Sequence, residues 1–116
     1  MAATIQELQK LIRKFRDERD WMQFHNHKDM ATALAIEAAE LQELFLWKQG
    51  EEIDEIASAK RERLSEELAD VAVYLLELAD NLGIDLGEAI VAKMAKNAAK
   101  YPVHKAKGSS AKYTEL

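Results

Sequence analysis

Apolar residues recur three or four positions apart along almost the whole chain, which is the spacing of one face of an α-helix. No stretch sustains the alternation of apolar and polar residues that indicates a half-buried strand. Four glycines and one proline are the only strong helix-breaking residues among 116. The pattern therefore predicts an all-α fold of the four-helix-bundle type, and a chain of this length forms one compact domain.

Local signals mark the first two predicted helices. Thr4 and Glu7 have the spacing of a capping box, so the first helix is expected to begin beside them. The second is expected over 28–49, because Gly50 can adopt the left-handed conformation that ends many helices. The apolar stripe of the first helix is made of Ile5, Leu8, Ile12 and Phe15.

The other two predicted helices follow an acidic segment. The third is expected over 59–82, where Gly83 ends it. Asp85 and Glu88 would cap the fourth, which stops near Pro102. The third helix has a spine made of Leu64, Leu68, Val71, Leu75, Leu78 and Leu82.

The second and third predicted helices are apolar around more than one face. A helix of a monomeric bundle needs only one apolar stripe. The excess favours a second buried face, most simply in a homo-oligomer. The alternative is that alanine-rich faces are tolerated in water.

Composition disfavours several classes of protein. The chain has no cysteine, which excludes a disulfide framework, a thiolate metal site and a cysteine nucleophile. Its net charge of −5 disfavours non-specific nucleic-acid binding, so no nucleic-acid partner is expected. The longest apolar run, 71–76, is too short to span a membrane, and the first residues carry no apolar signal core. We therefore expect a soluble, cytoplasmic protein without a membrane partner.

Two pairs of acidic residues interrupt the apolar helices. Glu37 and Glu40 lie three positions apart on the second helix, as do Glu67 and Asp70 on the third, so the members of each pair share a face. Carboxylates buried without compensation are costly, and such a cluster must be solvated, protonated, paired or bound to metal. Few carboxylates, retained waters and substrate phosphates suit Mg²⁺, with Mn²⁺ as a substitute. Tyr74 lies one turn beyond Asp70, on the same face.

The spacing of these pairs is weakly specific by itself. The pair Glu40 and Glu43 and the pair Glu52 and Glu55 have it too, and are more easily interpreted as solvated surface. The metal interpretation depends on two such pairs falling on adjacent apolar helices. A di-iron carboxylate bundle would need histidines three residues after glutamates, and this chain has none.

A third set of polar residues lies on the fourth predicted helix. Lys93, Asn97 and Lys100 share a face, and Tyr101 follows them. Cations and an amide opposite a metal cluster would suit a triphosphate. The alternative is that the lysines are ordinary solvated residues near a helix C-terminus, where the dipole favours them.

Aromatic residues near these sets could stack on a nucleobase. They are Trp21, Phe24, Trp47 and Tyr74. Core packing is the alternative, and for Phe24 it is the preferred one. His25 is a candidate for a contact with the edge of the base.

Taken in order, these segments resemble the MazG-like all-α nucleoside triphosphate pyrophosphohydrolases, and within them the dCTP pyrophosphatase branch. The matching segments are 18–25, 37–48, 66–74, 93–102 and 112–116. The catalytic domain would then span 1–102 and a C-terminal tail 103–116. Whether the tail folds over an active site stays open.

The resemblance implies a role for each set of residues. The Mg²⁺ ligands and catalytic acids would be Glu37, Glu40, Glu67 and Asp70. The residues facing the phosphates would be Lys93, Asn97, Lys100 and Tyr101. The base pocket would be formed by Trp21, Gln23, Phe24, His25, Trp47 and Tyr74. The family assembles as dimers or as tetramers, so a dimer or a dimer of dimers is expected.

The implied reaction is the hydrolysis of a deoxynucleoside triphosphate, dCTP by the resemblance, to the monophosphate and pyrophosphate, which cleanses the nucleotide pool. Glu37 or Glu40 would orient or deprotonate the attacking water. Ile12 stands where a polar base contact is expected, so dATP, dUTP and modified nucleotides stay open as substrates. A non-catalytic helical oligomerisation module is the alternative of another class, and it predicts no metal dependence.

Overall fold

The computed structural model describes residues 2–116, and every regular element in this range is a helix. The elements are α1 (Ile5–Glu18), η1 (Met22–Phe24), α2 (His27–Glu43), α3 (Glu51–Ala59), α4 (Arg61–Asn81), α5 (Leu86–Lys100), α6 (Val103–Ala106) and η2 (Tyr113–Glu115). The predicted all-α fold is confirmed. The chain forms two compact units, one ending at Gly83 and the other running from Ile84 to Leu116.

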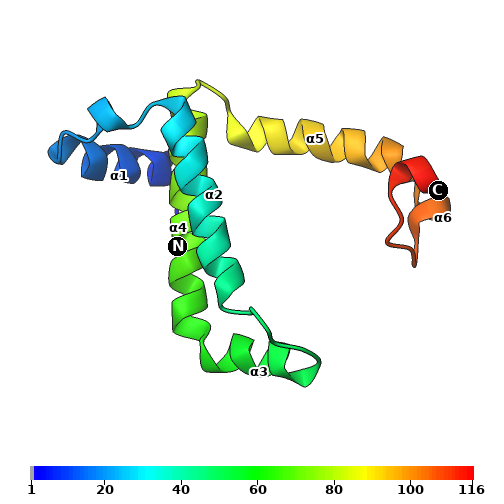
Figure 1. Ribbon diagram of the computed structural model, residues 1–116. Helices are drawn as coiled ribbons and strands as arrows, with labels where there is room; N and C mark the ends of the chain where they lie inside the picture. The colour runs from blue at the N-terminus through cyan, green and yellow to red at the C-terminus, as the bar shows by residue number, and fades with distance from the viewer. Residues whose placement is uncertain (1) are drawn as a thin grey trace. The chain divides into compact units, whose positions relative to one another are not determined.

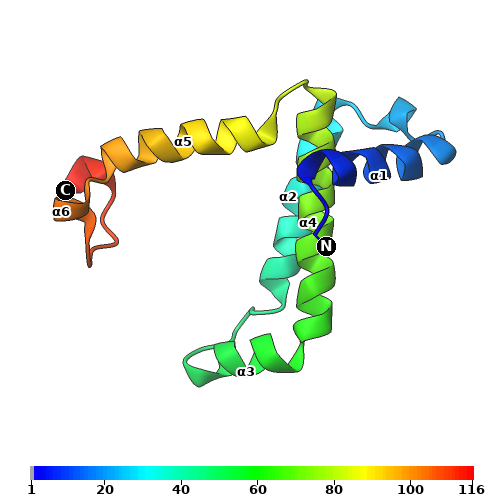
Figure 2. The same ribbon diagram turned by 180° about the vertical axis from the view of Figure 1, so that it is seen from behind.

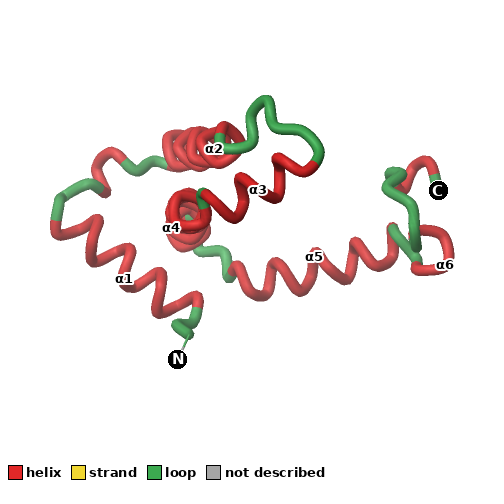
Figure 3. Tube along the Cα trace, turned by 90° about the horizontal axis from the view of Figure 1, so that it is seen from below, coloured by secondary structure: helices red, strands yellow, loops and turns green. Residues whose placement is uncertain are grey.

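Two antiparallel helices, α2 and α4, form the body of the first unit. Figures 1 and 2 show them side by side and running in opposite directions. Figure 3 shows the same pair end-on. Both α1 and α3 contact α4, which makes α4 the central helix of this unit. Residues far apart in sequence therefore meet along the face of α4.

Side-chain caps set the starts of three helices, as predicted for α1 and α5 but not for α2. Thr4 Oγ1 accepts a hydrogen bond from the Glu7 amide at 3.1 Å, and Glu7 Oε1 accepts one from the Thr4 amide at 3.3 Å. Such caps contribute about 1 kcal/mol each. Asn26 caps α2 and Asp85 caps α5 through the same type of bond to a backbone amide. The third and fourth predicted helices correspond to α4 and α5.

The second predicted helix is shorter than expected. It ends at Glu43 rather than Gln49, and residues 44–47 form turns. Trp47 adopts a φ of 67°, in the left-handed region that disfavours bulky residues, so the helix is broken before Gly50. Gly50 caps the start of α3 instead, in a segment predicted only as an acidic connection. Three acidic residues in the first turn of α3 suit the positive end of its dipole.

Acidic side chains, rather than leucines, occupy the packed face of α4. Glu67 and Glu77 are 5% and 3% exposed, whereas Leu68 and Leu75 are 55% and 40% exposed. The predicted leucine spine is thus partly exposed at the surface of the chain, at Leu68, Leu75 and Leu82, while its other members are half-buried. The reason is that the acidic face finds polar partners in Arg16 of α1 and in His25, which precedes α2.

The apolar stripe predicted on α1 also lies mostly at the surface. Phe15 is 51% exposed, while Gln9 and Arg16 are buried. Polar groups of α4 explain this arrangement, because Gln9 Nε2 donates to the backbone carbonyl of Leu76 at 3.0 Å. Among the described residues, Met30 and Ala79 are the apolar side chains that count as buried. Large apolar area on α1 and α4 is therefore left uncovered within the chain.

Across residues 2–116, none of the helices has both the length and the apolar character that crossing a membrane requires.

Candidate metal and nucleotide site

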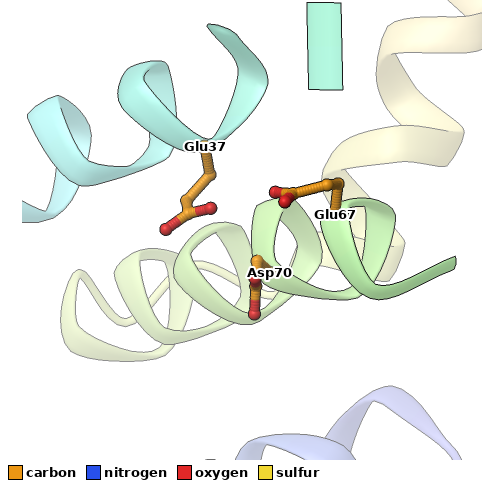
Figure 4. A group of neighbouring side chains, drawn as sticks. All are labelled: Glu37, Glu67 and Asp70. Atoms are coloured by element: carbon orange, nitrogen blue, oxygen red, sulfur yellow. The ribbon is translucent and has the colours of Figure 1, made fainter. Parts of the chain in front are cut away.

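The pairing of α2 with α4 brings together three of the four predicted carboxylates. One oxygen from each of Glu37, Glu67 and Asp70 lies within 4.8 Å of the others. Figure 4 shows Glu37 extending from α2 toward Glu67 and Asp70 on α4. The spacing of three positions places Glu67 and Asp70 on one face of α4, which is the face turned to α2. Glu40 is outside this trio but lies close enough to raise the pKa of Glu37.

The carboxylates of the trio disfavour one another's charge. Burial raises the pKa of Glu37 from 4.5 to about 7, and the hydrogen bond and charge of Glu40 and the charges of Asp70 and Glu67 act in the same direction. Removing charged groups from water and placing like charges together both favour the protonated acid. A cation at this point would remove both penalties.

Two buried oxygen atoms of the trio have no partner within residues 2–116: Oε2 of Glu37 and Oε2 of Glu67. The other oxygen of Glu67 accepts from Nε of Arg63 at 2.9 Å. Buried polar atoms are almost always satisfied, so the two exceptions suggest a missing ligand. Oxygen-only donors suit a hard divalent cation such as Mg²⁺, Mn²⁺ or Ca²⁺. The residues present therefore fit a divalent metal site.

A small pocket of about 70 Å³ lies between α1, α4 and the segment that joins α1 to α2. Three predicted base-contacting residues line it: Trp21, His25 and Tyr74. Trp21 contacts Phe15 edge-on, with ring centroids 5.7 Å apart, and lies 6.4 Å from His25. Ile12, which stands where the resemblance leads us to expect a polar base contact, also lines the pocket. The wall is thus mainly aromatic and apolar, with one imidazole and the charged pair Arg16 and Glu77.

Tyr74 connects the pocket with the carboxylates. It lines the pocket, and it lies one turn beyond Asp70 on α4. Burial raises its pKa first, and the charges of Glu37 and Asp70 raise it further. The phenol therefore keeps its proton and remains a hydrogen-bond donor between the two parts of the site.

A buried polar network closes one end of the pocket. Oε2 of Glu77 lies 2.8 Å from Nδ1 of His25, 3.2 Å from Nδ2 of Asn81 and 3.8 Å from Nη1 of Arg16. Arg16 also bonds Asn81 at 3.0 Å and Asp17 at 2.8 Å. The sequence analysis missed this network. The available signal was Glu77 itself, an isolated acid within the apolar run 75–79, one turn beyond Tyr74.

Three residues predicted for the base pocket lie elsewhere in the first unit. Gln23 bonds Asp20 within the same turn. Phe24 is 62% exposed, so the preferred interpretation of it as core is wrong. Trp47 is 85% exposed and lines a separate open cavity of about 570 Å³ with Phe45 and Leu46. Their roles toward a base stay predictions.

The residues predicted to face the phosphates belong to the second unit. Lys93, Asn97 and Lys100 lie on α5, and Tyr101 follows its last turn. Tyr101 contacts Tyr113 edge-on at 6.0 Å, and Nζ of Lys100 lies 4.8 Å from the centre of the Tyr113 ring. This end of α5 is therefore tied to η2 in the tail. A role toward phosphate stays a prediction for all four.

A family model described as the MazG-like family matches residues 32–116. This range contains the four carboxylates, Tyr74 and the whole of α5. The match covers most of the chain, and it includes all of α4 and the part of α2 that carries Glu37.

Individual proteins are similar over nearly the whole chain. The dCTP pyrophosphatase 1 proteins of Bos taurus and Homo sapiens are each 44% identical over 115 residues, which is 97% of this chain and 68% of theirs. A pyrophosphatase of Archaeoglobus fulgidus, known from its crystal structure, has a TM-score of 0.83 at 40% identity, covering 88% of this chain and 95% of that one.

Proposed function

The chain belongs to the MazG-like family, and from this premise we propose that it hydrolyses dCTP to dCMP and pyrophosphate with the help of Mg²⁺. It is a nucleoside triphosphate pyrophosphohydrolase, and its role is to remove deoxynucleoside triphosphates from the nucleotide pool. The observation that carries the proposal is the trio of carboxylates with two unpartnered buried oxygens. We place the reaction in the cytoplasm, with the nucleotide as the partner.

Glu37, Glu67 and Asp70 would hold the metal ion, because their oxygens converge and two of them lack partners. When bound, Mg²⁺ supplies a Lewis acid for the α-phosphoryl group and lowers the pKa of a bound water. Mn²⁺ has similar coordination and should substitute. Arg63 orients Glu67 by holding its Oε1 and leaving Oε2 free.

Glu40 is the carboxylate best placed to handle the attacking water. It lies outside the trio yet close enough to raise the pKa of Glu37, so it would be a carboxylate without metal that can accept a proton beside the reacting group. The pocket at Trp21 and Tyr74 would hold the base by stacking. Lys93 and Lys100, with Asn97 and Tyr101, would balance the charge of the phosphates and of the departing pyrophosphate.

We also propose that the active protein is a homo-oligomer, a dimer or a dimer of dimers. The support is the uncovered apolar face of α4, where Leu68, Leu75 and Leu82 are each at least 40% exposed. Monomeric proteins rarely leave such continuous apolar surface in water. An interface formed on it would also allow Trp47 to contribute to a neighbouring site.

Product analysis by anion-exchange chromatography tests the reaction. The protein would be incubated with each common NTP and dNTP, with and without Mg²⁺. We expect dCMP and pyrophosphate in equal amounts, formed only with the metal and lost in Glu37→Gln combined with Asp70→Asn. The matched control is Glu52→Gln combined with Glu55→Gln, which changes the same motif on α3 and should keep full activity. Diphosphate with orthophosphate would contradict the proposed site of cleavage.

A further inference from the structure

We propose that Glu77 is a positioning residue that fixes the hydrogen-bonding character of His25, so that the pocket favours triphosphates whose base carries an amino group at the edge facing His25. The proposal rests on the proposed function and deepens it, because it names the feature of the base that is selected. Nothing in the carboxylate trio is required for it.

The starting point is the geometry of the ring nitrogens. Nδ1 of His25 lies 2.8 Å from Oε2 and 3.1 Å from Oε1 of Glu77, so one nitrogen is committed to this carboxylate. Within residues 2–116, both hydrogen bonds of the His25 ring involve Nδ1. Because the imidazole lines the pocket, Nε2 is the nitrogen available to a ligand.

The surroundings of Glu77 hold its carboxylate in place. It is 3% exposed, and donors from two other residues, Asn81 and Arg16, converge on the same Oε2 that faces His25. Carboxylate oxygens accept hydrogen bonds, so the two short contacts of Nδ1 place a proton on that nitrogen. In the neutral ring, the Nε2 atom of His25 is then an acceptor.

A hydrogen-bond acceptor at Nε2 of His25 discriminates between bases of the same ring size that carry an amino group or a carbonyl. Cytosine and adenine present an exocyclic amino group, which donates, where uracil and hypoxanthine present a carbonyl, which only accepts. A carbonyl facing Nε2 would leave two buried acceptors opposed and unpaired. The pocket volume of about 70 Å³ holds little more than the edge of a ring, so contact at that edge weighs heavily.

The first test needs no variant and no turnover. Long-range ¹H–¹⁵N spectra of the wild-type protein report which ring nitrogen of His25 carries the proton. We expect the Nδ1–H form of a neutral ring near pH 7.5. An Nε2–H form, or a doubly protonated ring, would overturn the proposal.

The second test is the preference between matched substrates. The ratio of kcat/KM for dCTP over dUTP, and for dATP over dITP, isolates the amino group from ring size. We expect each ratio to favour the amino base by about tenfold, the size of one hydrogen bond gained or lost. A preference for the keto partner in both pairs would overturn the assignment.

Variants connect the preference to Glu77. Glu77→Gln should keep both ratios within about threefold of wild type, because the amide oxygen can replace Oε2 where the donors of His25 and Asn81 converge. Glu77→Leu should remove the preference, and His25→Phe should do the same while Glu77 remains. His27→Phe, an exposed histidine at the start of α2, is the matched control and should change neither ratio.

Measured together, these results separate the two proposals. If wild-type protein hydrolyses no triphosphate, the proposed function fails, while the spectrum still reports the proton of His25. If it hydrolyses dCTP but the ratios are unaffected by His25→Phe, the proposed function stands and the role of Glu77 is wrong. If Glu77→Leu does not fold, the spectrum of the wild-type protein and the kcat/KM ratios of His25→Phe still test the proposal.

Discussion

Two acidic sites lie along one face of α4, one at Glu77 and one at the trio. They differ in whether other side chains pair with their charges. Glu77 meets an arginine, a histidine and an asparagine within 3.8 Å. Glu37, Glu67 and Asp70 meet mainly one another, with Arg63 as the one cation bonded to the trio in the described chain. Buried charge that is paired within the chain supports the fold, whereas buried charge left unpaired needs a partner from outside. The contrast supports the trio as the proposed metal site.

The largest expected effect separates catalysis from stability. Glu37→Gln should lower turnover of dCTP by about a hundredfold or more, since a metal ligand is lost. The same change should raise the stability of the metal-free protein at pH 8, because it removes charge repulsion within the trio. Steady-state kinetics and denaturant unfolding measure the two effects. Glu43→Gln, on the same helix, is the control, and a metal-free protein destabilised by Glu37→Gln would contradict the contrast.

Glu77→Ala should behave in the opposite way. Removing one partner from a buried, paired network should lower the free energy of unfolding by about 3 kcal/mol, with or without metal. Thermal and urea unfolding would measure it, against Glu62→Ala on the exposed side of α4. An unchanged midpoint would mean that the Glu77 network contributes nothing to the fold.

Arg63 provides an intermediate case, because it pairs with one member of the trio. Arg63→Met should weaken Mg²⁺ binding by about tenfold, since Glu67 loses the group that orients it. Stability should change little, because the arginine side chain is 57% exposed. Isothermal titration with Mg²⁺ measures the affinity. Arg61→Met, at the exposed start of α4, should leave it unaltered.

The smallest expected effect is a pH dependence of the metal-free protein. The pKa of Glu37 rises from 4.5 to about 7 on folding, so between these values the folded protein holds a proton that the unfolded chain has released. Stability from this group is complete below about pH 4.5 and is lost as the pH rises through about 7. A shift of this size in an isolated group corresponds to about 3 kcal/mol, and the partial exposure of Glu37 and its coupling to Glu40 lower the expected change to about 1 kcal/mol. Unfolding between pH 5 and 8 measures it, and Glu37→Gln should abolish the slope.

Metal binding should follow the reverse trend, since the ligands must lose protons first. Mg²⁺ affinity should increase as the pH rises through about 7, with release of a proton on binding. Affinity that is constant from pH 5 to 8 would show that the trio is not the binding site.

Helical periodicity was sufficient to predict the fold class and the acidic pairs. A spacing of three or four residues fixes which side chains share a face, so Glu67, Asp70 and Tyr74 could be grouped from the chain alone. Periodicity does not decide which face turns inward. Nothing in the spacing showed that Arg16 and His25 would pair with the acidic face of α4, and only the packed structure reveals that choice.

Local conformation limited the prediction at the end of α2. Trp47 is a poor candidate for a left-handed residue, so nothing in the sequence indicated that the helix would end at Glu43. The Glu77 network needed the long-range approach of α1 to α4, since Arg16 and Glu77 are far apart in sequence. Each residue of this network can be read in the sequence, but the sequence does not show that the residues contact one another.

Replacing Trp47 should raise the thermal stability of this chain, because of the backbone conformation at this residue. A bulky residue held at a φ of 67° costs the fold about 1 kcal/mol or more, and glycine would hold the same turn without that cost. The ring itself is 85% exposed and gives little packing in return. A screen for heat resistance should therefore select glycine here. Within the chain the tryptophan opposes stability, and in the proposed homo-oligomer a contact with a neighbouring chain would offset that cost.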